Sequence, residues 1–146
     1  MDIRENFDNI KREISEACGK VDRSPEDIKV IAVTKYVTDA RVEQAIEVGV
    51  DAFAENRPQN YLERKQKYSD KEWHLIGSLQ TRKVRDVINH VDYFHALDRE
   101  SLAKEIEKRA EDKVNCFVQV NVSGEESKHG LTSHETIEFI KGLGKY

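Results

Sequence analysis

Residues 30–54 read VIAVTKYVTDARVEQAIEVGVDAFA, and this stretch decides the fold class. Its first part, 30–34, is short, apolar and rich in β-branched residues, which is typical of a strand that is covered on both faces. In 38–48 the apolar residues recur at helical spacing, which predicts a helix, and a second strand is expected over 50–54. The stretch therefore predicts a strand, a helix and a strand in succession.

The same alternation extends in both directions along the chain. An amphipathic helix is expected over 2–19, and Thr38 or Asp39 is the expected N-cap of the second helix. The final helix begins with Thr132 and Glu135 at the spacing of a capping box. The remaining predicted elements are helices over 58–68, 81–89, 99–111 and from 132 onward, and strands over 73–76, 93–97 and 114–122.

Strict alternation of strands and helices predicts a parallel sheet with right-handed crossovers. Two architectures fit it, an open doubly wound sheet and part of a closed (β/α)₈ barrel, and the repeat length separates them poorly. The chain holds about five βα units, fewer than the eight of a closed barrel. Composition does not shift along 1–146, so we expect one domain over the whole range.

The composition excludes several function classes. Of the 146 residues, 36% are charged, yet the net charge is only −4, so bulk charge does not attract nucleic acid or an anionic membrane. No apolar run approaches the roughly 18 residues of a spanning helix, and the N-terminus is charged where a secretory signal would be apolar. Cys18 and Cys116 form no CxxC pair, which suits a reducing compartment. We therefore expect a cytoplasmic protein with neither a nucleic-acid nor a membrane partner.

Polar residues follow each predicted strand, and Lys35 is the most informative of them. The carboxyl ends of parallel strands bind ligands, because loops vary there and helix N-termini present unpaired N–H groups. Caps and turns explain Asp98 and Ser123, but not a lysine directly after VIAVT. At the rim of a packed core its amine would be partly desolvated, which favours the neutral form that attacks an aldehyde. The alternative is that Lys35 extends into water and has no chemical role.

Five strings now carry a specific resemblance, and they occur in order between residues 30 and 131. They are VIAVTK, AENRPQN, WHLIGSLQTRK, HALDRESLA and VQVNVSGEESKHGL. Together they resemble the successive signatures of the YggS/PROSC-type pyridoxal-phosphate homeostasis proteins, whose fold is similar to the N-terminal domain of alanine racemase. The resemblance implies a parallel (β/α)₈ barrel of the TIM-barrel type, truncated here to about five βα units after an N-terminal helix.

The resemblance also implies a cofactor and the residues that bind it. The cofactor is pyridoxal 5′-phosphate, held as a Schiff base on the lysine that ends the first barrel strand, which is Lys35 here. Asn56 is implied to lie beside the cofactor ring. His74, Gln80 and Asn121 stand at matching positions and are expected to contact the cofactor, although for His74 a satisfied, partly buried histidine is an equally good interpretation.

The sequence departs from the family in one respect. The family's phosphate is held by a Gly-rich segment after the later strands together with an arginine, and no such segment occurs here. Five parallel strands also cannot close a barrel, so unpaired strand edges would remain. We therefore expect a fragment or truncated product that completes its sheet by self-association.

Two functional classes remain open, a cofactor carrier and a racemase-like enzyme. Racemisation needs an acid–base group on each face of the substrate carbon, and Lys35 could supply only one. Tyr36 is too close to Lys35 in sequence to reach the opposite face. A metal site is not expected, because no set of cysteine or acidic ligands accompanies His129 and His134. A carrier in pyridoxal-phosphate homeostasis is therefore the preferred prediction.

Overall fold

The computed structural model describes residues 2–146. Residue contacts group these residues into two compact units, unit 1 up to Phe53 and unit 2 from Ala54 to Tyr146. The helices are α1 (Ile3–Gly19), α2 (Asp39–Glu47), α3 (Pro58–Lys67), α4 (Val84–Val87), α5 (Glu100–Arg109) and α6 (Ser133–Gly142). The strands are β1 (Ala32–Val33), β2 (Ala52–Glu55), β3 (Glu72–Leu75), β4 (Tyr93–Leu97) and β5 (Asn115–Val118). Single 3₁₀ turns lie at Pro25–Asp27, Thr81–Lys83, Ile88–His90 and Leu143–Lys145.

The order of the strands distinguishes the two architectures that the sequence left open. It follows the chain, β1-β2-β3-β4-β5. The pairings of β3 with β4 and of β4 with β5 are parallel. A doubly wound sheet reverses its strand order at a switch point, whereas a barrel adds strands consecutively. The consecutive order therefore favours the barrel type, and the parallel α/β class is confirmed. The expectation of a single domain over 1–146 stays a prediction.

Unit 1 begins with α1, whose start is fixed by a side chain. An Asp2 carboxylate oxygen accepts from the backbone N–H of Arg4 at 2.9 Å, as an N-cap does. The cap of α2 is Thr38 rather than Asp39, since the Thr38 hydroxyl accepts from the Arg41 N–H at 3.3 Å. Both helices therefore start where capping chemistry predicts.

The expectation that the first strand is covered on both faces was wrong. β1 has only two residues, and Val33 is 50% exposed while Thr34 is buried. β1 stands at one end of the strand order, so it has a strand neighbour on one side only. A run of apolar residues indicates that a strand has covered faces only if the neighbouring elements are present to cover them.

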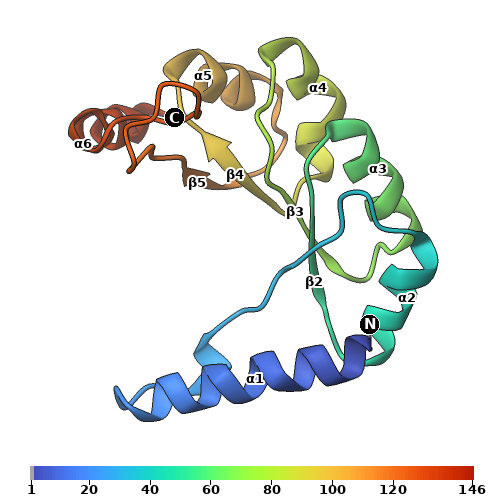
Figure 1. The fold of residues 1–146 in the computed structure, drawn as a ribbon. Coiled ribbons are helices and arrows are strands. Elements are labelled where there is room, and N and C mark those ends of the chain that lie inside the picture. Colours follow the sequence, from blue (N-terminus) through green and yellow to red (C-terminus); the bar gives the residue numbers. More distant parts are fainter. Residues whose placement is uncertain (1) are drawn as a thin grey trace. The chain divides into compact units, whose positions relative to one another are not determined.

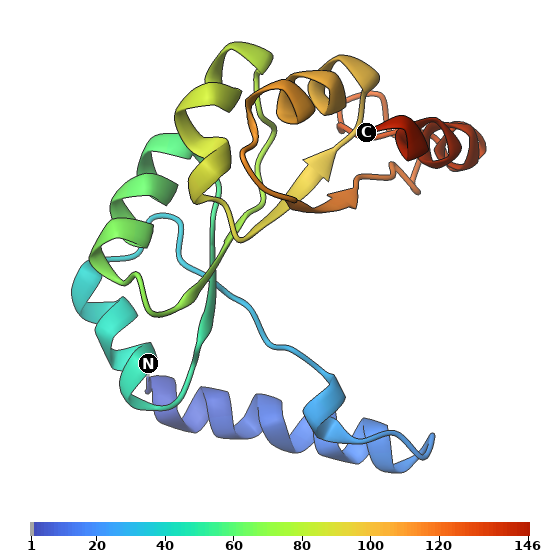
Figure 2. The ribbon, with the colours of Figure 1, turned by 180° about the vertical axis from the view of Figure 1, so that it is seen from behind.

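Unit 2 places its core between the strands and three helices. Figures 1 and 2 show α3, α4 and α5 along one face of β3, β4 and β5. Trp73 points to that face, because its indole N–H donates to the Tyr68 carbonyl at the end of α3, 2.9 Å away. The fully buried side chains of this unit include Tyr61, Trp73, Leu75, Leu79, Val84, Phe94 and Leu102.

Two predicted elements of unit 2 differ from the structure. The helix expected over 81–89 is a 3₁₀ turn, the four-residue α4 and a second 3₁₀ turn. None of the three has a side-chain cap, and the segment is rich in valine and isoleucine, which favour helix less than unbranched residues do. The strand expected over 114–122 is shorter than predicted and ends at Val118. The chain then forms a loop, and Leu131 at the end of this loop makes an isolated bridge with Val120.

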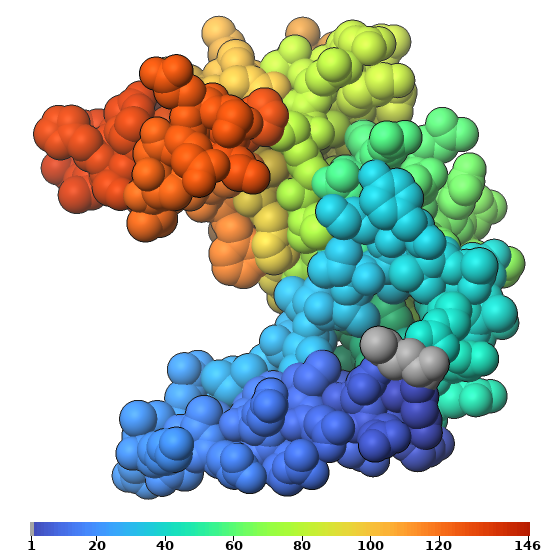
Figure 3. All heavy atoms as spheres, in the orientation of Figure 1, coloured from blue at the N-terminus to red at the C-terminus, as the bar shows by residue number. Residues whose placement is uncertain are grey.

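The last helix, α6, begins with the predicted capping box. The Thr132 hydroxyl accepts from the Glu135 N–H at 3.1 Å, and the Glu135 carboxylate accepts from the Thr132 N–H at 3.2 Å. These bonds hold the Glu135 carboxylate in its ionised form and lower its pKa. No residue of α6 is buried, and its atoms, red in Figure 3, lie at the surface.

Candidate functional site

Lys35 follows Thr34 after the end of β1, in a tight turn. The Val37 N–H donates to the Thr34 carbonyl at 3.1 Å, which places Lys35 and Tyr36 at the two central positions of the turn. Tyr36 has a φ of 66°, a left-handed conformation that a bulky side chain adopts only with strain. The strain is local to the residue next to the predicted cofactor lysine, and such strain is concentrated at functional sites in proteins.

The Lys35 side chain is exposed, as is Tyr36, which is 86% exposed. The sequence predicted that the rim of a packed core would shelter the amine. This prediction was wrong for the described residues, which leave the Lys35 side chain exposed. The reason is the same as for Val33, since β1 is short and lies at one end of the strand order. An exposed amine is nevertheless open to an incoming aldehyde.

Asn56 and Gln80 follow β2 and β3 in unit 2. Asn56 is half-buried. The hydrogen bonds between β2 and β3 extend to the residue before it, because the Ile76 N–H donates to the Glu55 carbonyl at 3.0 Å. Gln80 is exposed, and its carbonyl accepts from the Lys83 N–H at 2.9 Å. Both residues therefore lie at the carboxyl ends of strands, as predicted, and their contacts with a cofactor stay predictions.

Sequence reasoning overlooked Arg99, which orders the segment before Gln80. Its Nη2 atom donates to the Leu79 carbonyl at 2.6 Å, and its Nη1 atom donates to the Asp98 carboxylate at 2.9 Å. The sequence suggested Asp98 as a cap, but its carboxylate pairs with the neighbouring Arg99 guanidinium instead. An arginine directly after a predicted strand and an aspartate was the signal that could have found this pair.

His74 lies within β3 rather than at its end, and it is 2% exposed. Its Nδ1 atom is 2.7 Å from His95 Nε2, and its Nε2 atom is 3.2 Å from a Glu72 carboxylate oxygen. Its ring also stacks on Tyr93, with centroids 4.6 Å apart and an angle of 7° between the planes. Both ring nitrogens thus have partners, which is the geometry of a satisfied buried histidine.

We call Glu72, His74, Tyr93, His95 and Phe117 the histidine cluster. In the β3–β4 register His74 pairs with Tyr93, so the two side chains point to one face, opposite to that of Trp73. The Phe117 ring lies 4.6 Å from the His95 ring and is 53% exposed. Burial, and to a smaller extent the neighbouring His74, lower the pKa of His95. Sequence reasoning missed His95, whose partner depends on the sheet register.

Asn121 organises the loop that follows β5. Its Oδ1 atom accepts from the Gly124 N–H at 3.1 Å and from the Ser123 hydroxyl at 3.1 Å. Its Nδ2 atom donates to the Glu125 carbonyl at 2.7 Å. The amide is therefore engaged at both ends within the loop, and a direct contact between Asn121 and the cofactor stays a prediction.

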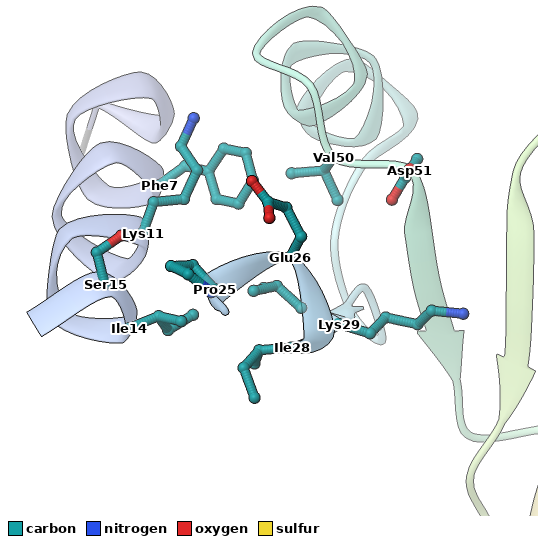
Figure 4. A pocket seen from close by; sticks show the side chains of 11 residues that line it. Phe7, Lys11, Ile14, Ser15, Pro25, Glu26, Ile28, Lys29, Val50 and Asp51 are labelled. Carbon is teal, nitrogen blue, oxygen red and sulfur yellow. The ribbon is translucent and has the colours of Figure 1, made fainter. Parts of the chain in front are cut away.

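A pocket of unit 1 lies apart from the predicted site residues. It measures about 420 Å³, and Figure 4 shows Phe7 and Lys11 of α1 on one side of it, with Pro25 and Val50 also in its lining. Lys29 and Asp51, also in its lining, come before β1 and β2, so this pocket lies at the amino ends of those strands. In parallel α/β folds that end serves stability, and ligands bind at the opposite end.

Residues 2–146 contain no group of three or more histidine, cysteine, aspartate or glutamate residues placed to hold a metal ion. Within the same range, no helix is both long and apolar enough to cross a membrane.

Comparison with protein families decides the relationship. The model of the alanine racemase N-terminal domain matches residues 3–145. This chain belongs to that family. The consecutive strand order agrees with the family's barrel-type fold.

Individual relatives agree with the family. The pyridoxal phosphate homeostasis protein of Haemophilus influenzae is 34% identical over 150 residues, covering 98% of this chain and 63% of that protein. A crystal structure of an unknown protein from Bifidobacterium adolescentis is 27% identical, has a TM-score of 0.87 and is matched over 98% of this chain and 64% of that one. PipY of Synechococcus elongatus, solved without pyridoxal phosphate, is 25% identical with a TM-score of 0.75, over 90% of this chain and 64% of PipY. The chain thus spans less than two thirds of each of these relatives.

Proposed function

We propose that this chain binds pyridoxal 5′-phosphate as a Schiff base on Lys35 and serves intracellular pyridoxal-phosphate homeostasis. The observation that carries the proposal is the position of Lys35, an exposed amine at the carboxyl end of β1 in a turn with a strained neighbour. Membership of the family and the name of the 34% identical relative support the choice of cofactor. Pyridoxal phosphate supplies an aldehyde and, once bound, an electron sink.

The chemistry assigned to Lys35 is one condensation. Its amine would hold the aldehyde carbon of the cofactor through a carbon–nitrogen double bond, with loss of one water molecule. Asn56 is proposed to contact the cofactor ring through its amide, and Gln80 to make a further polar contact. For His74 and Asn121 to contact the cofactor, their side chains would have to exchange partners, because the polar atoms of both already have partners in unit 2.

A carrier fits the described residues better than an enzyme does. Racemisation requires two acid–base groups on opposite faces of one carbon, and Lys35 is one such group. Tyr36 follows it in the same turn and is 86% exposed, so no described packing directs its hydroxyl. We therefore propose binding without turnover of amino acids.

The test is a titration of the purified chain with pyridoxal phosphate. We expect a visible absorption band that is absent in Lys35→Ala and retained in Lys20→Ala, which removes an exposed lysine at the end of α1. Reduction with borohydride and peptide mapping should place the adduct on Lys35. A band that survives in Lys35→Ala would refute the proposal, and loss of optical activity in L-alanine would favour the racemase-like alternative.

We also propose a cytoplasmic location. Cys18 and Cys116 are both free, and burial raises the pKa of the Cys116 thiol to about 11, which keeps it protonated and unreactive. Free, inert thiols suit a reducing compartment. Fractionation of cells that express the chain should recover it with cytoplasmic markers, and recovery with membranes or secreted proteins would contradict this.

A further inference from the structure

Gly77 and Asn56 face each other where β3 and β2 end. The Ile76 N–H donates to the Glu55 carbonyl at 3.0 Å, so the next residue of each segment continues the same close approach. Gly77 is buried, and Asn56 is half-buried. The two residues thus form one contact within unit 2, at the end of the strands where ligands bind in this class of fold.

The contact leaves no room for a side chain at position 77. A β-carbon added to Gly77 would overlap both the backbone carbonyl oxygen and the side-chain Oδ1 of Asn56, and it would lie 3.0 Å from the Asn56 carbonyl carbon. Gly77 has no positive φ, unlike Gly49, Gly124 and Gly130. The position therefore needs glycine for space and not for backbone conformation.

The segment that contains Gly77 is held on its far side as well. Leu79 is 1% exposed, and its carbonyl accepts from Arg99 Nη2 at 2.6 Å. Because the Ile76 bond and the Arg99 bond fix both ends of this segment, Gly77 has little freedom to withdraw. A larger residue at position 77 would therefore displace Asn56.

We infer that Gly77 is a positioning residue for Asn56, holding the direction of the Asn56 amide by contact with its carbonyl and Oδ1 oxygens. The inference rests on the proposed function, because the consequence of a displaced amide is measured through the cofactor. It gives Gly77 a role that is separate from any contact of its own with the ligand.

The first test is Gly77→Ala, measured by titration with pyridoxal phosphate and by circular dichroism. We expect the dissociation constant to rise about tenfold or more with the secondary structure retained, since small displacements of a contact residue are costly. The control is Gly142→Ala in α6, where an added β-carbon meets no atom within 4 Å and binding should not change. Unchanged binding in Gly77→Ala would overturn the inference, whereas a wild-type chain that binds no cofactor would overturn the proposed function instead.

A double-mutant cycle separates positioning from a general loss of structure. If Gly77 acts through the Asn56 side chain, Gly77→Ala should weaken binding far less in an Asn56→Ala background than in the wild type. Additive losses would show that Gly77 acts by another route and would overturn the inference.

A measurement on the wild-type chain covers the case in which Gly77→Ala does not fold. Nitrogen-15 relaxation of the side-chain amides should show an Asn56 amide as rigid as the backbone, and a mobile amide for the exposed Gln80. A mobile Asn56 amide would overturn the inference without any substitution.

Discussion

The Nδ1 atom of His74 and the Nε2 atom of His95 lie 2.7 Å apart, so a single hydrogen atom is shared between two imidazole rings. His74 Nε2 faces a Glu72 carboxylate oxygen at 3.2 Å, and that nitrogen must carry a hydrogen to donate to it. With both rings neutral, His95 Nε2–H then donates to His74 Nδ1. The order of donation is from His95 to His74 to Glu72, and the remaining nitrogen of His95 is the place for an additional proton.

This arrangement predicts a pH-dependent stability. Burial and His74 lower the folded-state pKa of His95, so the unfolded chain binds more protons than the folded chain between the two pKa values. The contribution to stability is complete above the unfolded pKa of about 6.5 and is lost as the pH falls through the lower folded value. Urea unfolding between about pH 5 and 7.5 should show a midpoint that rises with pH. His95→Gln should flatten that rise, whereas replacement of the exposed His134 should not; equal slopes in both variants would contradict the prediction.

The hydroxyl of Tyr61 joins α3 to the segment 90–92 of unit 2, and its loss should be costly. It donates to the His90 carbonyl at 2.9 Å and accepts from the Asp92 N–H at 3.1 Å, within a fully buried side chain. Tyr61→Phe should lower the free energy of unfolding by about 1–3 kcal/mol, because buried partners lose their hydrogen bonds. Tyr36→Phe, which alters an exposed ring, should change it by less than about 0.5 kcal/mol. Denaturant unfolding checks both values, and equal effects would argue against the network.

Arg99 should be sensitive to replacement even by lysine. Its guanidinium reaches the Leu79 carbonyl and the Asp98 carboxylate at once, which a single ammonium group cannot reproduce with the same geometry. Arg99→Lys should destabilise the chain by about 1 kcal/mol, and Arg82→Lys on the exposed turn after Gln80 should be neutral. Thermal unfolding distinguishes the two, and a neutral Arg99→Lys would mean that the lysine preserves the contact.

Self-association through β5 is the prediction that follows from the strand order. β5 has a strand neighbour on one side only, and Phe117 within it is 53% exposed. Sedimentation should show an average molecular mass that increases with protein concentration. Phe117→Lys should reduce this increase, because a charged residue disfavours pairing at a sheet edge. Ile137→Lys on α6 replaces a similarly exposed apolar residue and should leave association unchanged. A wild-type chain that stays monomeric at all concentrations would refute the prediction.

Local signals in the sequence predicted those features that depend on neighbours along the chain. Thr38 and Thr132 cap the helices that they were expected to begin, and β4 has the expected bounds of 93–97. The exposure of Val33 and of Lys35 could not be predicted from sequence neighbours, because burial of a strand depends on elements that are distant in the sequence and pack over it. The pairing of His74 with His95 also required the β3–β4 register, which aligns His74 with Tyr93 and is set by the packing of the whole sheet.

The parallel pairing of β4 with β3, and of β5 with β4, also bears on how the chain is made. Each of these strands hydrogen-bonds to the strand synthesised immediately before it, across one short connection that contains helical turns. Loop closure then spans only a short stretch of polypeptide, which speeds folding. A nascent chain leaving the ribosome can consequently extend its sheet one strand at a time, while the next strand is still being translated.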